Sequence, residues 1–264
     1  MTWGNVEGML GPVLRRCRWS SPLGLFLLAI GTLSGCSSGT ETGNPPFTGE
    51  LSYTAFSSEP SQVGLPASVS AAVVDNAWLD LDAVGFLSAG SCSAAQPAEL
   101  VVPALGIGDH AAGNHNVTLF ESTATSYCGL DLPFALAAAG ELGSAPAALA
   151  DHSIMIKGTL ADGTSFQILS SATPTVHLAA DGETFALDAA AARTTIAFDV
   201  AVWLSNLDFS SAARVGETIS ISAQENPALL AQFERNLPGG IALYRDEDGD
   251  GKLDVNPVRL AHGE

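Results

Sequence analysis

Basic residues are scarce in this chain. It contains ten Lys and Arg residues against 28 Asp and Glu residues, which gives a formal net charge of −18 at pH 7. A surface with this charge repels nucleic acid phosphates and anionic lipid head groups, because binding to either depends on basic side chains. The composition therefore predicts no nucleic-acid partner and favours solubility and cation binding.

An apolar run long enough to cross a membrane is also missing near the start of the chain. Residues 22–32 are mostly apolar, but a membrane-spanning helix needs about 20 such residues. Arginines at positions 15, 16 and 18 precede the run, and Leu33-Ser34-Gly35-Cys36 follows it. A basic segment, a short apolar segment and small residues, in this order, are typical of a signal peptide. We therefore expect residues 1–35 to be removed.

Leu33-Ser34-Gly35-Cys36 resembles the lipobox of bacterial lipoproteins, in which the cysteine becomes the acylated N-terminus. The resemblance implies that Cys36 carries lipid, since several acyl chains together anchor a protein where one chain binds only reversibly. Ser37 follows, where an aspartate would favour retention at the inner membrane. The implied location is thus the cell envelope, at the outer membrane. The alternative is that Cys36 only neighbours an ordinary secretory cleavage site.

The segment after Cys36 has the composition of a flexible tether. Residues 37–46 are small and polar and are interrupted by Pro and Gly. The motif Gly-Thr-Glu-Thr-Gly-Asn-Pro at 39–45 resembles the tether of a group of uncharacterised bacterial lipoproteins. This resemblance implies no particular activity. We expect a tether over residues 36–48 and one folded domain over residues 49–264.

Cysteine is rare, and its four positions have different expected fates. Cys17 leaves with the signal peptide, and Cys36 is assigned to lipid, which leaves Cys92 and Cys128. In an oxidising envelope a remaining pair most simply forms a disulfide. The alternative, a metal-thiolate pair, lacks a nearby Cys-x-x-Cys or Cys/His pattern.

Short β-branched or alternating runs, separated by Gly, Pro, Asp and Ser, follow the tether. This pattern predicts an all-β domain, and sheets of such short strands usually close as a sandwich or barrel. We expect a β-sandwich with one or two short helices near the C-terminus. Asp162-Gly163 predicts a hairpin turn. The expected strands span residues 51–56, 67–74, 77–87, 99–105, 116–120, 153–160, 165–170, 175–178 and 194–200.

Two segments predict helices. Residues 201–213 include Trp203, which the surrounding apolar residues place in the core. In residues 226–237, Asn226 stands at the expected N-cap and Pro227 at the first helical position. This helix is expected to pack on the sheet through one apolar face, formed by Leu229, Leu230, Phe233 and Leu237. Residues 131–150 are rich in Ala and Leu but broken by Pro and Gly, which predicts a loop with a helical turn.

The most specific pattern is the acidic stretch Asp-Glu-Asp-Gly-Asp-Gly-Lys-Leu-Asp at 246–254. It resembles the calcium loop of EF-hand and dockerin-like proteins. The resemblance implies a Ca²⁺ ion held by carboxylates and one backbone carbonyl, with Gly251 at the sharp turn. The implied ligands are the side chains of Asp246, Asp248, Asp250 and Asp254 and the carbonyl of Lys252.

The loop departs from this resemblance at two points. Pro257 stands where a bidentate carboxylate is usual, and residues 241–244 have the pattern of a strand rather than a helix. A missing ligand would then come from Glu247, from a distant acidic side chain or from water. The alternative is an acidic, solvated turn without an ion. If calcium binds, we expect a dissociation constant of about 10⁻⁴ to 10⁻³ M.

Two other groups of residues are weaker candidates for a binding site, one for a metal ion and one for a sugar. Asp109, His110 and His115 offer a carboxylate and two imidazoles, but their spacing fits no common zinc pattern, which favours an ordinary loop. A strand through Trp78 would place Trp78, Asp80 and Asp82 on one face, as in some sugar-binding surfaces. The stronger interpretation is a Trp packed under a loop with the aspartates in water. The remaining histidines, His152, His177 and His262, are expected to be structural, the last in a fraying tail.

No signature of an enzyme is present. The chain lacks His-Glu-x-x-His, Gly-x-Ser-x-Gly and a phosphate-binding glycine loop. Our first hypothesis is a non-enzymatic, lipid-anchored module that binds another envelope protein or a matrix polysaccharide, with calcium in its C-terminal loop. The alternative is a secreted-type glycan hydrolase that uses Asp80 and Asp82 or the 246–254 carboxylates.

We predict that cells incorporate labelled palmitate into the protein and that Cys36→Ala abolishes the labelling, because the acyl chains would be attached through this residue. Metabolic labelling and immunoprecipitation measure the effect. Cys17→Ala is the control, since Cys17 precedes the cleavage site. Label that persists in the Cys36→Ala variant would contradict lipidation.

Overall fold

The computed structural model describes residues 46–56, 72–90, 98–111, 116–123, 125–189, 192–254 and 256–264, which all belong to one compact unit, Gly43–Glu264. The predicted signal peptide, Cys36, Cys92 and His115 lie outside the described residues. No helix in the described part of the chain is long and apolar enough to span a membrane.

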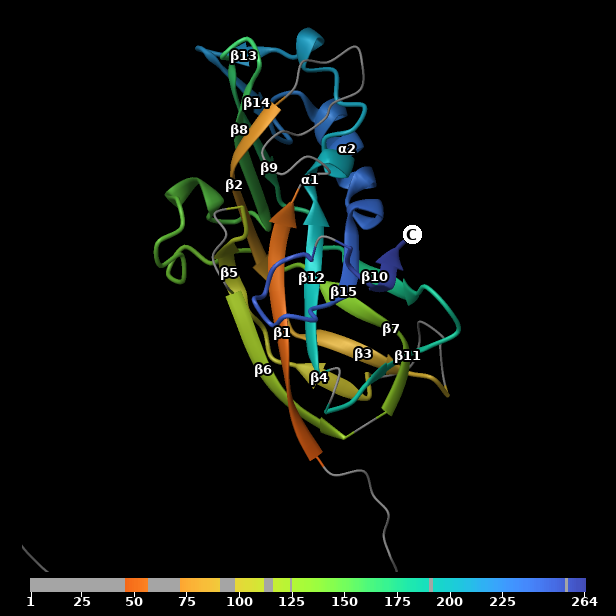
Figure 1. The fold of residues 1–264 in the computed structure, drawn as a ribbon. Helices are drawn as coiled ribbons and strands as arrows, with labels where there is room; N and C mark the ends of the chain where they lie inside the picture. The colour runs from red at the N-terminus through yellow and green to blue at the C-terminus, as the bar shows by residue number, and fades with distance from the viewer. Residues whose placement is uncertain are drawn as a thin grey trace, which may run out of the picture. The chain divides into compact units, whose positions relative to one another are not determined.

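The described residues form two β-sheets with a few short helices (Figure 1). The strands are β1 (Pro46–Phe56), β2 (Ala72–Leu81), β3 (Val84–Ser88), β4 (Leu100–Val102), β5 (Gly106–Asp109), β6 (Asn116–Thr123), β7 (Thr125–Pro133), β8 (Ile154–Leu160), β9 (Ser165–Ser170), β10 (Thr175–Ala180), β11 (Phe185–Leu187), β12 (Arg193–Asp199), β13 (Arg214–Val215), β14 (Thr218–Ile221), β15 (Ile241–Arg245) and β16 (Arg259–Gly263). The helices are α1 (Val200–Trp203) and α2 (Pro227–Asn236), with 3₁₀ turns η1 (Ala147–Leu149), η2 (Phe209–Ser211) and η3 (Pro238–Gly240).

The larger sheet has ten strands and curls strongly. Its order is β4-β3-β7-β10-β16-β15-β12-β1-β6, with β11 paired to β7. The two edge strands, β4 and β6, lie close to each other, so the sheet is nearly closed like a barrel. β1 pairs with β12 in parallel and with β6 antiparallel. The first strand begins at Pro46 and therefore extends into the segment predicted as tether.

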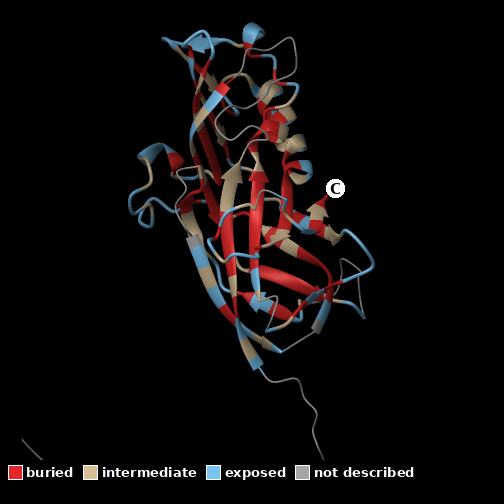
Figure 2. Cartoon of the chain, in the orientation of Figure 1, coloured by how far each residue is buried: buried red, intermediate tan, exposed pale blue. Residues whose placement is uncertain are grey.

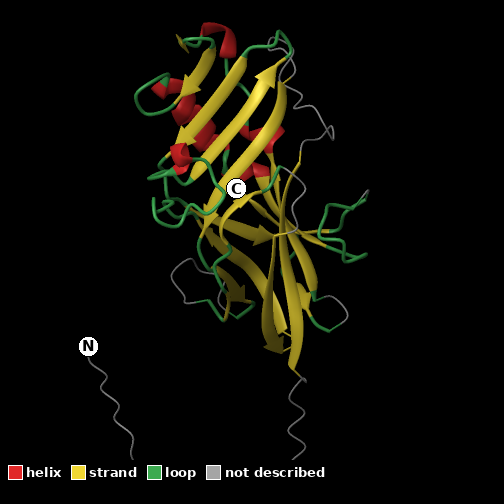
Figure 3. Ribbon diagram, turned by 90° about the vertical axis from the view of Figure 1, so that its left-hand side faces the viewer, coloured by secondary structure: helices red, strands yellow, loops and turns green. Residues whose placement is uncertain are grey.

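The smaller sheet has six strands in the order β13-β14-β9-β8-β2-β5. The predicted hairpin at Asp162-Gly163 is confirmed: β8 and β9 pair antiparallel, and Gly163 has φ +83°. The Asp162 carboxylate accepts a hydrogen bond from the backbone N–H of Thr164 at 2.8 Å, and this bond closes the turn. Figure 3 shows the helices beside this sheet, where α2 packs against β9 and β14.

The two sheets share one apolar core, seen as buried segments along the strands in Figure 2. Trp203 is fully buried, as predicted, and its indole N–H donates to the Leu237 carbonyl at 3.0 Å. Its ring packs against Phe198 of β12 and Phe233 of α2. The all-β class with few short helices is thus confirmed, with the larger sheet curled towards a barrel.

Several predicted boundaries are wrong. The run at 77–87 is not one strand: it divides at Asp82 into β2 and β3, which belong to different sheets. Both halves are apolar because both are buried, so the pattern gave no sign of the corner. The helix expected at 201–213 is only α1, followed by η2. The predicted fraying tail is instead β16, which is hydrogen-bonded between β10 and β15.

The second predicted helix is confirmed, but its first residue works differently from expectation. Asn226 occupies the N-cap position with φ +57° and makes no side-chain hydrogen bond to the helix. The side-chain oxygen of Asn226 instead accepts a hydrogen bond from the Ala213 backbone N–H, and its side-chain NH₂ donates to the carbonyls of Ala213 and Ser220. Asn226 therefore ties the start of α2 to the smaller sheet.

The predicted disulfide has one partner among the described residues. Cys128 lies in β7 and is buried, with its sulfur 3.3 Å from the carbonyl oxygen of Ser88 at the end of β3. Cys92 follows Ser88 by four residues in the sequence. The pairing of Cys92 with Cys128 stays a prediction.

His110 is a buried histidine beside the core. It is 1% exposed and packs against the rings of Tyr53 and Phe198. Burial lowers its pKa to about 4, although a hydrogen bond to the Tyr53 backbone and the nearby Asp109 carboxylate act in the opposite direction. His110 is therefore neutral in the folded protein at pH 7.

This shift predicts a loss of stability in mild acid. The unfolded chain binds a proton at His110 below pH 6.5, whereas the folded chain does so only near pH 4, so stability falls across this window by roughly 3 kcal/mol. We expect His110→Gln, which cannot titrate, to lose less stability than the parent between pH 7 and pH 4. Urea unfolding at several pH values measures this, and parallel curves for the two proteins would contradict it.

Candidate metal centre

The acidic loop at 246–254 lies between two paired strands. It follows β15, and the backbone N–H of Arg245 donates to the Val258 carbonyl at 2.9 Å before β16 begins. The backbone N–H of Asp246 donates to the carbonyl of Arg193 on β12 at 3.2 Å. The loop therefore starts from a point fixed on the larger sheet, and residues 241–244 form a strand as predicted.

Three of the predicted ligands lie together. Carboxylate oxygens of Asp246, Asp248 and Asp250 lie within 4.8 Å of one another, and no other group of three or more metal-ligating side chains occurs within the described ranges. Asp246 is buried, while Asp248 and Asp250 are exposed. One buried and two exposed carboxylates form a partly open cluster of hard oxygen ligands.

Backbone hydrogen bonds to the carboxylates shape the loop. The two oxygens of Asp246 accept the amides of Gly249 (2.7 Å) and Gly251 (3.0 Å). Asp248 accepts the amide of Asp250 at 3.1 Å, and Asp250 accepts that of Lys252 at 2.8 Å. Each carboxylate thus folds the following residues back towards itself.

Two glycines make these turns possible. Gly249 and Gly251 have φ values of +73° and +71°, a conformation that side chains disfavour. The sharp turn expected at Gly251 is therefore present, and Gly249 adds a second one.

The surroundings of Asp246 disfavour its charged, deprotonated form. Burial raises its pKa, and the nearby Asp248 and Asp250 raise it further, while the two amide hydrogen bonds act against this shift. A cation among the three carboxylates would relieve their mutual repulsion. Protons and a cation would compete for the same group.

The other two implied ligands are the Lys252 carbonyl, which stays a prediction, and the Asp254 carboxylate. The Lys252 side chain directs its ammonium to Asp250, 3.0 Å from Oδ2, in an exposed ion pair of the kind that contributes little. Asp254 does not belong to the cluster of three, and its Oδ2 accepts the Glu247 amide at 3.2 Å.

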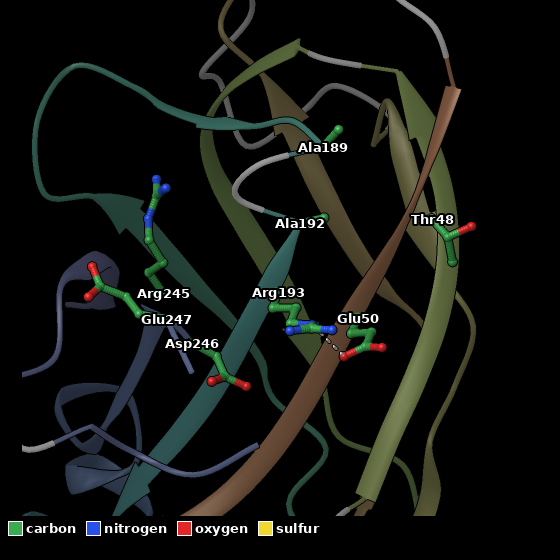
Figure 4. Close-up of a pocket in the computed structure, with 8 residues that line it drawn as sticks. All are labelled: Thr48, Glu50, Ala189, Ala192, Arg193, Arg245, Asp246 and Glu247. Carbon is green, nitrogen blue, oxygen red and sulfur yellow. Dashed lines mark ion pairs between the residues drawn. The ribbon is translucent and has the colours of Figure 1, made fainter. Parts of the chain in front are cut away.

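A pocket of about 590 Å³ adjoins the loop. Its lining includes an ion pair that sequence analysis missed, Arg193 Nε to Glu50 Oε2 at 3.2 Å (Figure 4). Glu50 and Arg193 are direct neighbours on the parallel strands β1 and β12. Because the two residues lie far apart in the sequence, no local sequence pattern predicts their contact. The remaining lining residues are Thr48, Ala189, Ala192, Arg245, Asp246 and Glu247.

The Asp109 group is structural within the described residues. The buried Asp109 carboxylate accepts the backbone amides of Ala77 (3.0 Å) and Ala111 (3.1 Å) and the side-chain amide of Asn76 (2.7 Å). These bonds tie the end of β5 to β2. The other histidines also have near neighbours: His152 Nδ1 lies 2.8 Å from the Ala150 carbonyl, and His177 and His262 lie 2.9 and 2.6 Å from Asp131 and Asp181.

Trp78 packs as the stronger interpretation predicts, but the prediction that both aspartates lie in water is wrong for Asp80. Trp78 is half-buried against a small apolar cluster that includes Leu149 and Met155, under the loop that follows β7. Asp80 is buried, and burial, followed by Glu141 and Asp82, raises its pKa. Asp82 lies beyond the end of β2 and accepts the Ala83 amide at 2.7 Å. The three side chains therefore do not form one exposed strand face.

Comparison with known proteins gives little further information. No protein-family model and no curated protein matches the chain. Among solved structures, MbnP from Methylosinus trichosporium matches with a TM-score of 0.35 and 12% identity, over 68% of this chain and 82% of MbnP. A likeness of this degree supports no statement about the function of this chain.

The loop geometry predicts unequal roles for its aspartates. In chelator, we expect Asp246→Ala to lower the free energy of unfolding by about 1 to 3 kcal/mol, because it leaves the buried Gly251 amide without its acceptor. Asp248→Ala, at an exposed position, should change it by less than about 0.5 kcal/mol. Urea denaturation measures both, and equal effects would contradict the assignment.

Proposed function

We propose that this chain is a lipid-anchored envelope protein whose β domain is a non-enzymatic binding or structural module and whose 246–254 loop binds calcium. The observation on which the ion site rests is the cluster of Asp246, Asp248 and Asp250 oxygens within 4.8 Å. The anchor rests on Cys36 and the signal pattern before it.

Calcium suits this loop better than other common cations. The candidate ligands are carboxylate oxygens, which favour hard cations over those that prefer imidazole or thiolate. Magnesium needs near-ideal octahedral geometry, whereas calcium accepts six to eight oxygens in flexible arrangements. Pro257 at the usual bidentate position leaves places for water or for an oxygen from a partner. Because the loop lacks the usual bidentate carboxylate, we expect a calcium dissociation constant of about 10⁻⁴ to 10⁻³ M, as in extracellular calcium-binding modules.

The expected partner is another envelope protein or a matrix polysaccharide. The acidic surface disfavours anionic partners unless a cation lies between them. The hydrolase hypothesis receives less support at Asp80 and Asp82, because Asp80 is buried and Asp82 lies outside the strand. Its other candidate residues are the 246–254 carboxylates, and glycan turnover that depends on any of these residues would favour the hydrolase.

Calcium titration of the purified mature protein tests the ion site. If the dissociation constant is about 1 mM, 10 mM calcium should stabilise the fold by about 1.4 kcal/mol and raise Tm by roughly 3 to 5 °C relative to chelator. The double variant Asp246→Ala, Asp250→Ala should lose this shift, and calorimetry should show no binding. An equal shift in the variant, or none in the parent, would reject calcium binding by this loop.

A further inference from the structure

Arg193 connects two strands through its side chain and its position. It opens β12 and lies directly opposite Glu50 on the parallel strand β1. The two side chains form an ion pair with Nε to Oε2 at 3.2 Å, and both remain about half exposed, at 54% and 41%. Figure 4 shows this pair beside Asp246, with Arg245 lying apart from it. The guanidinium thus lies beside the Glu50 carboxylate.

The same guanidinium lies against the backbone of the acidic loop. A Cβ added to Gly249 would overlap the Nη1 and Cζ atoms of Arg193, so the arginine occupies the space that any side chain at 249 would need. The Arg193 carbonyl also accepts the Asp246 amide at 3.2 Å. Arg193 therefore contacts the loop at two places, through its main chain at Asp246 and through its side chain at Gly249.

We infer that Arg193, paired with Glu50, is a positioning residue that keeps residues 246–251 in the conformation in which their three carboxylates converge. Gly249 donates to Asp246, so fixing Gly249 also fixes the buried ligand. The inference rests on the proposed calcium site for its functional meaning. Residues that orient metal ligands typically change affinity by 10- to 100-fold when removed.

Charge and position can be separated experimentally. Arg193 is a cation near a proposed cation site, so removing it alone would strengthen the attraction for calcium while releasing the loop. The double variant Arg193→Gln, Glu50→Gln removes the ion pair without changing the net charge. Arg214→Gln, Glu217→Gln is its control, because both residues are exposed in the hairpin of β13 and β14 in the smaller sheet and the net charge is again unchanged.

Two measurements test the inference. In chelator, hydrogen exchange of the Gly249 and Gly251 amides should be about tenfold faster in the Arg193→Gln, Glu50→Gln variant and unchanged in the control. The calcium dissociation constant should rise about tenfold in the former and stay within twofold in the latter. Arg193→Lys, which keeps the charge without the planar guanidinium, should also weaken binding.

The outcomes separate the two proposals. Unchanged exchange at Gly249 and Gly251 in the double variant would overturn the positioning role, whatever calcium does. Faster exchange with an unchanged dissociation constant would also overturn it. A parent protein that does not bind calcium would reject the proposed ion site, while the exchange measurement would still decide whether Arg193 holds the loop.

Discussion

The parallel pairing of β1 with β12 is the constraint on which the rest of the molecule depends. It joins residues 50–56 to residues 193–199 in the larger sheet, where β1 lies next to the edge strand β6 and β12 lies next to β15. Closing a loop of this length has a substantial entropic cost, although the cost grows only slowly with length. The pairing brings Glu50 to Arg193 and provides the carbonyl that anchors Asp246. The candidate metal centre therefore depends on a contact between distant segments of the chain.

Local features of the fold were predictable from local chemistry. Asp162-Gly163 specifies a turn because its residues favour the required backbone conformation, and Pro227 starts a helix because its φ angle already suits one. The acidic stretch specifies its own turns in the same way, since alternating aspartates accept nearby amides and the glycines adopt positive φ. The sequence therefore indicates all three converging carboxylates without any knowledge of the fold.

Long-range features were not predictable from the same evidence. An apolar run looks alike whether it stays in one sheet or changes sheets, so the corner at Asp82 was missed. Arg193 and Glu50 carry no spacing signal, because their contact arises only from strand register. The position of β16 at the end of the chain predicts a fraying tail, because terminal residues usually fray unless a sheet holds them. Here β10 and β15 hold the strand in the sheet.

The place of β1 in the sheet has a mechanical consequence. Residues 46–53 pair with β6, and residues 50–56 pair with β12, so the strand is hydrogen-bonded on both sides at its middle. A pull applied at Pro46 along the strand would load these hydrogen bonds together, in shear, rather than opening them one at a time. Resistance to forced unfolding is set by the unfolding rate. A pulling force on a domain held at this end would thus act first on a strand whose residues 50–53 are paired on both sides.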